Sequence, residues 1–124
     1  MAPALRAGVA GVVTTRPVGI THAHWGAQTH TCATAVDLDL WAAALAVANG
    51  DTQVAIVDCD TGGYPNSLVA QIRGVITQLT GIPETHVRVS ASQTHSGGNV
   101  SPAWYDDGRE MIGPYVASVS SGLF

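Results

Sequence analysis

The chain contains no lysine and has little charge of either sign. Its 124 residues carry five Lys plus Arg, all of them arginine, against nine Asp plus Glu, which gives a formal net charge of -4. Without a basic cluster nothing can follow a phosphate backbone, so we expect no nucleic-acid partner. Charged residues make up only 11% of the chain, fewer than a free domain usually exposes. This shortage predicts a surface that is normally covered.

Cysteines and long apolar runs are also scarce. Cys32 and Cys59 lack CxxC spacing, which argues against a redox motif or a zinc ribbon, and we expect two free thiols. No stretch approaches the roughly 18 uninterrupted apolar residues of a membrane helix. The apolar run near the N-terminus alternates with glycine, which is more typical of a strand than of a signal peptide. We therefore expect no transmembrane segment and a cytoplasmic location, with secretion left open.

Periodicity predicts an α/β chain. Strands are expected over residues 5–13, 38–47, 54–60 and 86–92, although the alanine-rich second segment could also form a short helix. The turn after it is expected at Asn49-Gly50, with positive φ at both residues. Residues 14–36 show no period and predict an unusually long loop, a feature that is often functional.

Two helices are expected, over residues 64–83 and from residue 106 onward. Pro65 suits the first turn of the first helix and Gly81 its end. The residues expected on its apolar face are Leu68, Ile72, Val75, Ile76 and Leu79. In the second helix, Gly113-Pro114 predicts an interruption.

Several segments resemble, in the same order, the neutral/alkaline non-lysosomal ceramidase family. "LRAGVAGVVTTRPVGI" is similar to the family's opening strand and "TPPVGI" turn, and "VAIVDCD" to its "VALVSLD". "TGIPETHVRVSASQTHSGG" is similar to its turn, strand and "ATHTHSGP" loop. The resemblance implies a mixed sheet with helices in the order strand-strand-strand-helix-strand-helix. It also implies that residues 1–124 form a single domain, the incomplete N-terminal portion of an αββα ceramidase-type catalytic domain.

This resemblance implies a zinc-dependent amidase that hydrolyses the N-acyl bond of ceramide-like lipid amides. The first histidine of the family's "HTH" is a zinc ligand and falls on Gln93, whereas the second has a catalytic role and falls on His95. If the strand geometry continues, these two side chains point to the same side. The backbone N–H groups of Ser96, Gly97 and Gly98 could hold an anion or oxyanion.

Glutamine at the ligand position weakens the expected metal site. Catalytic zinc usually needs three protein ligands and an open position, and an amide oxygen is a poor substitute for imidazole. The family's other ligands, a His, a Glu and a Tyr, match none of Glu84, Glu110, Tyr64, Tyr105 and Tyr115. We therefore expect impaired zinc binding and an inactive isolated chain. The alternative is a non-catalytic α/β domain that associates with itself or with a second, complementing chain.

Three other patterns have ordinary interpretations. His22, His24, His30 and Cys32 could supply a zinc site by number, but their spacing is more typical of a polar loop. Asp60-Thr61-Gly62 is the tripeptide of dimeric aspartic proteases, yet a predicted helix follows it where those enzymes have a hairpin. His86 is expected to be an exposed residue at the start of a strand.

Overall fold

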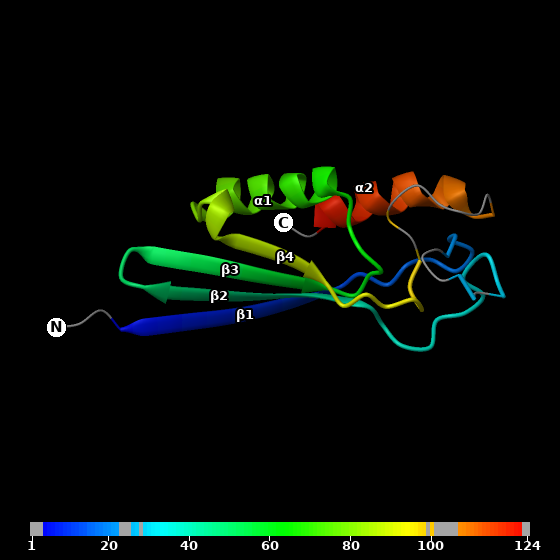
Figure 1. Cartoon of the computed structure of the whole chain (residues 1–124), viewed down its shortest axis with the longest axis horizontal. Helices are drawn as coiled ribbons and strands as arrows, with labels where there is room; N and C mark the ends of the chain where they lie inside the picture. Colours follow the sequence, from blue (N-terminus) through cyan, green and yellow to red (C-terminus); the bar gives the residue numbers. More distant parts are fainter. Residues whose placement is uncertain (1–3, 23–25, 28, 99, 101–106, 123–124) are drawn as a thin grey trace.

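The computed structural model describes residues 4–22, 26–27, 29–98, 100 and 107–122. Its elements in chain order are β1 (Leu5–Val13), β2 (Trp41–Asn49), β3 (Thr52–Cys59), α1 (Asn66–Thr80), η1 (Glu84–His86), β4 (Val87–Ala91), η2 (Arg109–Met111) and α2 (Ile112–Gly122). The strands form one sheet in the order β1-β2-β3-β4, and both helices lie on the same side of it (Figure 1). The predicted α/β fold class and element order are confirmed.

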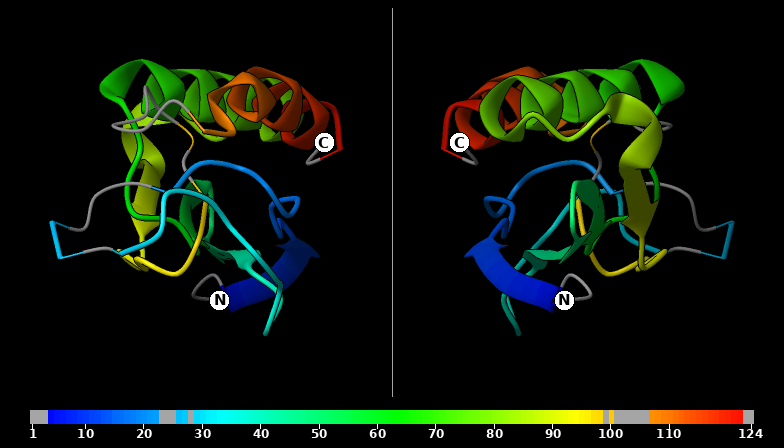
Figure 2. Two further views of the ribbon diagram at one scale, coloured as in Figure 1. Left: turned by 90° about the vertical axis from the view of Figure 1, so that its right-hand side faces the viewer. Right: turned by 90° about the vertical axis from the view of Figure 1, so that its left-hand side faces the viewer.

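The sheet is mixed. Strands β1, β2 and β3 pair antiparallel through the first part of the chain, and β4 then pairs parallel to β3. A parallel pair requires a crossover, which α1 provides. Viewed along the strands, the helices form a layer over one face of a strongly twisted sheet (Figure 2). Within the described residues, the helices therefore cover one face of the sheet and leave the other uncovered.

The alanine-rich segment forms strand β2, so the helical alternative is wrong. The turn that follows also differs from the prediction. Asn49 still pairs with Thr52, which leaves Gly50 and Asp51 as the two central residues. Of these only Gly50 has a positive φ, at 59°. The predicted Asn49-Gly50 turn is wrong because the antiparallel ladder holds Asn49 in extended conformation.

Helix α1 begins and ends at the expected signals. Pro65 occupies its N-cap position, and Gly81, with a φ of 76°, donates its backbone N–H to the carbonyl of Thr77. Leu79, however, is 62% exposed, so its assignment to the apolar face is wrong. The inner face follows the row of residues 68, 72, 76 and 80, spaced by four, which leaves Leu79 at its margin in the last turn.

Helix α2 contains Gly113 and Pro114 without an interruption. The helix begins at Ile112, so both residues fall in its first turn. Proline is tolerated there because its missing N–H would have no partner within the helix. The predicted break is therefore wrong. Within the described part of the chain, no helix is long and apolar enough to cross a membrane.

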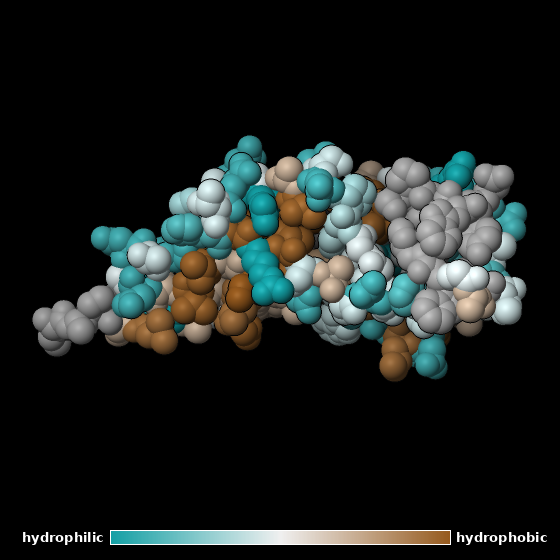
Figure 3. All heavy atoms as spheres, viewed as in Figure 1, coloured by the Kyte–Doolittle hydropathy of each residue, from teal (hydrophilic) through white to brown (hydrophobic). Residues whose placement is uncertain are grey.

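The sheet face away from the helices is apolar and open to solvent. On this face, seven large hydrophobic side chains of the strands are more than a third exposed: Leu5, Val9, Val13, Trp41, Leu45, Val54 and Ile56. Alternation along the strands puts them on this face, and hydrophobic atoms are visible below the strands in Figure 3. Contiguous apolar surface of this kind usually marks an interaction site. An apolar face of this kind is consistent with the low charge content, which predicted a surface that is normally covered.

Candidate functional site

The loop that contains Gln93 and His95 follows the carboxyl end of strand β4. This end lies beside the carboxyl end of β3, because Cys59 and Ala91 are partners in the parallel ladder. The Ser92 N–H donates to the Cys59 carbonyl at 3.0 Å and joins the two strand ends. In α/β sheets, ligands commonly bind beyond the carboxyl ends of parallel strands. The structure therefore places Gln93 and His95 at the end of the sheet where ligands commonly bind.

The backbone turns at Gln93. Its φ of 59° is the left-handed conformation, which a non-glycine residue seldom adopts, and its side chain is exposed. Strand β4 has already ended at Ala91. The continued strand geometry on which the expected common side of Gln93 and His95 depended is therefore absent at Gln93. His95 is half-buried.

Tight packing fixes the end of this loop. A Cβ atom at Gly97 would lie 3.0 Å from Leu40 Cδ1, and one at Gly98 would collide with Ile20 Cγ2. Ile20 is itself fully buried, so it has little room to move. The Ser96 N–H donates to Thr94 Oγ1 at 3.2 Å, so one of the three amides predicted to bind an anion already has a partner in the loop. The role of Gly97 and Gly98 remains a prediction.

Arg16 lies beneath the loop and was missed by sequence reasoning. It is only 4% exposed, and its Nη1 donates to the Asp60 carbonyl at 2.7 Å. Its Cζ lies 5.3 Å from the centroid of the Tyr115 ring, within range of a cation–π contact. A Cβ at Gly97 would be 3.7 Å from the same Nη1. Arg16 is one of only five basic residues in the chain and lies three residues after the end of β1, but this position does not by itself indicate burial.

The buried Cys59 and the half-buried Tyr64 form a polar pair at this end of the sheet. Burial raises the pKa of the Cys59 thiol, and the hydrogen bond from Tyr64 only partly offsets this. Burial also raises the pKa of Tyr64 well above its usual range. The hydrogen bond to Cys59 raises this pKa further, as the second-largest cause. Because the thiolate is the reactive form, this raised pKa disfavours Cys59 as a nucleophile. Cys32 and Cys59 are both free thiols, as predicted.

The described residues alone do not fit a zinc ion. Among residues 4–22, 26–27, 29–98, 100 and 107–122, no group of three or more His, Cys, Asp or Glu side chains comes together in a way that could hold a metal. At the position that the resemblance aligns with a zinc-ligating histidine, the chain has an exposed glutamine. Imidazole or carboxylate donors from elsewhere would be needed to complete a metal site here.

Part of the histidine-rich loop is folded back on itself. Thr21 and Cys32 form an isolated bridge, and the His22 N–H donates to the Thr31 carbonyl at 2.8 Å. His22 Nδ1 and His30 Nε2 are 3.0 Å apart, and the rings meet edge to face. These two imidazoles are partners of one another. His24 lies outside the described residues.

The two other sequence patterns have structural roles. Asp60 Oδ2 accepts the backbone N–H of Trp41 at 2.9 Å, which fixes the end of β3 against the start of β2. Thr61 is buried, and α1 follows after a short turn, as expected. His86 is exposed, and its Nδ1 lies 2.9 Å from the Gln53 carbonyl. It belongs to η1, the turn that leads into β4.

His22 should make stability depend on pH. Burial, and secondarily His30, holds the pKa of His22 below its ordinary value of 6.5. As the pH falls, His22 therefore takes up a proton in the unfolded chain at a higher pH than in the folded chain. This contribution to stability is complete above pH 6.5 and is lost as the pH falls below it, by at most about 1.4 kcal/mol per pH unit. Thermal melting at pH 7.5, 6.5 and 5.5 should show the decline, and His22→Gln should reduce it.

His86→Gln is the matched control, because it removes one imidazole from an exposed position. It should leave the decline of the wild-type chain in place. An equally steep decline in His22→Gln would contradict the assignment to His22.

Comparison with known proteins gives a structural likeness without a sequence match. No family model matches the chain, and no curated protein matches its sequence. The crystal structure of neutral ceramidase from Pseudomonas aeruginosa is similar over 98% of this chain and 21% of that one, with a TM-score of 0.69 and 13% identity. A structure described as ceramidase complexed with C2 is similar over 94% and 20%, with a TM-score of 0.68 and 14% identity. The chain thus has the fold of about one fifth of these ceramidase structures.

Proposed function

We propose that this chain supplies part of a ceramidase-like, metal-dependent amide hydrolase acting on lipid amides, and that it is inactive alone. The observation that carries the proposal is the likeness to neutral ceramidase over 98% of the chain. The loop of residues 92–98, at the carboxyl ends of β3 and β4, supports it. The same loop carries the "QTHSGG" segment that resembles the family's "HTHSGP".

The chain's own residues would assist such a reaction rather than complete it. His95 is the proposed acid or base, because imidazole is the side chain that most often transfers protons in catalysis. Gly97 and Gly98 are proposed to turn backbone N–H groups toward developing negative charge. The buried Arg16 guanidinium beneath the loop adds fixed positive charge. Zinc ligands are proposed to come from outside this chain, with Gln93 beside them.

A chimera tests the proposal. The chain would replace the structurally equivalent fifth of the Pseudomonas aeruginosa ceramidase, which would supply the remainder of the domain. We expect weak zinc retention and low ceramide hydrolysis with Gln93, and at least tenfold tighter zinc binding with Gln93→His, because imidazole is the better donor. Zinc content by elemental analysis and release of fatty acid report the two properties separately.

Two further variants of the Gln93→His chimera distinguish roles within the loop. His95→Ala should lower turnover by about 100-fold or more while zinc content stays nearly constant. Ser92→Ala, a small change to an exposed side chain nearby, is the control and should alter neither. Equal loss of zinc and activity in His95→Ala would make His95 a metal ligand. Stoichiometric, tightly held zinc in the unmodified 124-residue chain would show that the account of Gln93 is wrong.

The open apolar face of the sheet favours a second candidate function. In this alternative the chain is a non-catalytic α/β domain that pairs with a second chain, and the 92–98 loop is structural or binds a ligand. Exposed side chains such as Val9, at 84%, and Trp41, at 48%, support association on that face. If the chimera folds and retains zinc in the Gln93→His form but never hydrolyses amide, this alternative is the better one.

A further inference from the structure

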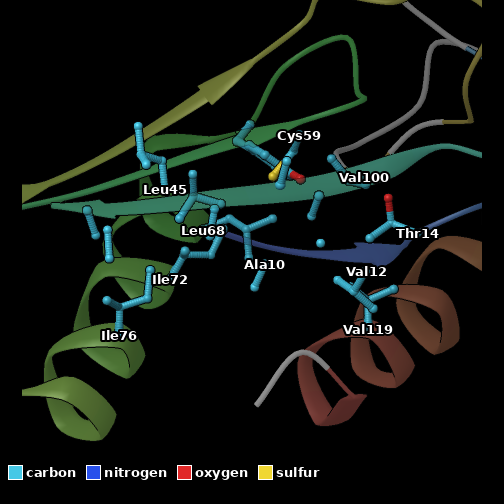
Figure 4. A pocket seen from close by; sticks show the side chains of 18 of the residues that line it. Ala10, Val12, Thr14, Leu45, Cys59, Leu68, Ile72, Ile76, Val100 and Val119 are labelled. Atoms are coloured by element: carbon cyan, nitrogen blue, oxygen red, sulfur yellow. The ribbon is translucent and has the colours of Figure 1, made fainter. Parts of the chain in front are cut away.

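A cavity of about 360 Å³ lies between the sheet and the two helices. Alanine lines most of its sheet side, including Ala10, Ala42, Ala44, Ala46 and Ala55, which leaves space that larger side chains would fill. Leu68, Ile72 and Ile76 of α1 face it, as do Val116 and Val119 of α2. Figure 4 shows α1 side chains at one end of the cavity and Thr14 and Val100 at the other. The volume is within the usual range of ligand pockets.

Four polar side chains of the cavity gather toward the carboxyl ends of β1 and β3, and Thr80, at the end of α1, also lines it. Thr14 and Cys59 line it there, together with Tyr64 and Tyr115. The Tyr115 hydroxyl donates to the Thr14 carbonyl at 2.7 Å, and Tyr64 is hydrogen-bonded to Cys59. Much of their hydrogen-bonding capacity is thus used within the protein. Apart from Thr80, the rest of the lining is apolar and suits a hydrocarbon chain.

Arg16 lies next to this polar end. It lines a second hollow, of about 790 Å³, which shares Val12, Thr14, Tyr115 and Val119 with the cavity. The guanidinium contacts the Asp60 carbonyl and the Tyr115 ring, while its buried Nε has no hydrogen-bond partner. No carboxylate among the described residues pairs with it; Glu110, which also lines the hollow, is exposed. A buried cation without a counter-charge is costly.

We propose that the cavity and Arg16 together bind a long-chain carboxylate. The aliphatic tail occupies the alanine-lined cavity, and the carboxylate lies at the Arg16 guanidinium, whose planar N–H groups match its geometry. An uncharged hydrocarbon would fill the cavity but leave Arg16 without an anion. The inference goes beyond the proposed function and does not rest on it, because binding requires neither a metal ion nor His95.

Fluorescence titration with cis-parinaric acid, a long-chain fatty acid that emits when bound in an apolar site, tests the proposal on the 124-residue chain. We expect saturable binding of one molecule per chain. Dodecanoate should displace the probe at least tenfold better than 1-dodecanol, which has the same tail without the charge. Shorter carboxylates should bind about fourfold more weakly for each methylene removed.

Three variants locate the site. Ala44→Leu fills the cavity and should weaken probe binding at least tenfold, while the melting temperature is maintained or rises, as cavity filling predicts. Val119→Phe fills it from α2 and serves the same purpose if the first variant does not fold. Arg16→Met should reduce the affinity for dodecanoate to that for 1-dodecanol and leave 1-dodecanol unaffected. Ala7→Leu, on the open face of β1, is the matched control and should bind like the wild type.

Three results would overturn the inference. Absence of saturable binding by the wild-type chain would do so directly. Equal affinity for dodecanoate and 1-dodecanol would remove Arg16 from the site. Equal weakening by Ala7→Leu and Ala44→Leu would move the fatty acid to the open sheet face. The binding experiment does not measure hydrolysis. A failure to bind fatty acid would therefore leave the proposed hydrolase function untouched, and an inactive chimera would leave the fatty-acid proposal untouched.

Discussion

Purified alone, the 124-residue chain should form oligomers or soluble aggregates rather than a stable monomer. Its sheet exposes an apolar face in which Val9 is 84% and Leu5 71% exposed. Burial of such surface contributes roughly 25 cal/mol per Å², and few charged side chains on this face oppose association. Strand β1 also has an unpaired edge. Size-exclusion chromatography with light scattering, over a range of concentrations, measures the effect.

Charge introduced on the open face should reverse this association. Val9→Lys with Ile56→Lys places two like charges on the face, and we expect a largely monomeric protein with far-UV circular dichroism like that of the wild type. Leu79→Lys is the matched control, because Leu79 is 62% exposed but belongs to α1 on the other side. A wild-type chain that stays monomeric at high concentration would refute the role assigned to this face. Equal solubilisation by Leu79→Lys would attribute association to general lack of charge.

Strand positions could be predicted from the sequence, but the exposure of their two faces could not. The segment "LRAGVAGVV" forms β1 over the predicted residues, because its β-branched valines suit an extended chain. Both faces of β1 and β2 consist mainly of Ala, Val, Gly and Leu. Alternation of apolar with polar residues, the usual sign of a solvent-facing side, is absent. The uncovered face is visible only once the positions of both helices are known.

The candidate site was predictable in part. The strand-loop order and the "QTHSGG" segment located Gln93 and His95 at the end of β4. The left-handed backbone at Gln93 and the packing of Gly98 against Ile20 depend on contacts from far along the chain. Arg16 was missed for the same reason. Its neighbours, Asp60 and Tyr115, are 44 and 99 residues away in sequence, so no local pattern reports its burial.

Replacement of Gly108 should unfold the connection between the long loop and helix α2. Gly108 has a φ of 72°, and a Cβ there would collide with the carbonyl oxygen of Gly19 and lie 2.8 Å from the Thr21 nitrogen. Both neighbours are backbone atoms and cannot rotate away. The Gly108 carbonyl accepts the Thr21 N–H at 3.4 Å and the Met111 N–H at 3.2 Å, so the contact joins Gly19–Thr21 to η2.

For Gly108→Ala we expect the free energy of unfolding to fall by about 3 kcal/mol or more, the combined cost of the left-handed backbone and the collision. The melting temperature should fall by more than about 10 °C. Gly113→Ala, five residues along in α2, is the matched control: a Cβ there meets nothing within 4 Å, and alanine in a helix should stabilise by about 0.5 kcal/mol. Denaturant unfolding of both variants in the Val9→Lys, Ile56→Lys background separates stability from association.

Equal stability of the two variants would show that α2 does not pack on Gly19–Thr21 in solution. The shared lining of the cavity by β1 and α2 would then have to be reconsidered, since Tyr115 and Val119 depend on that packing for their positions.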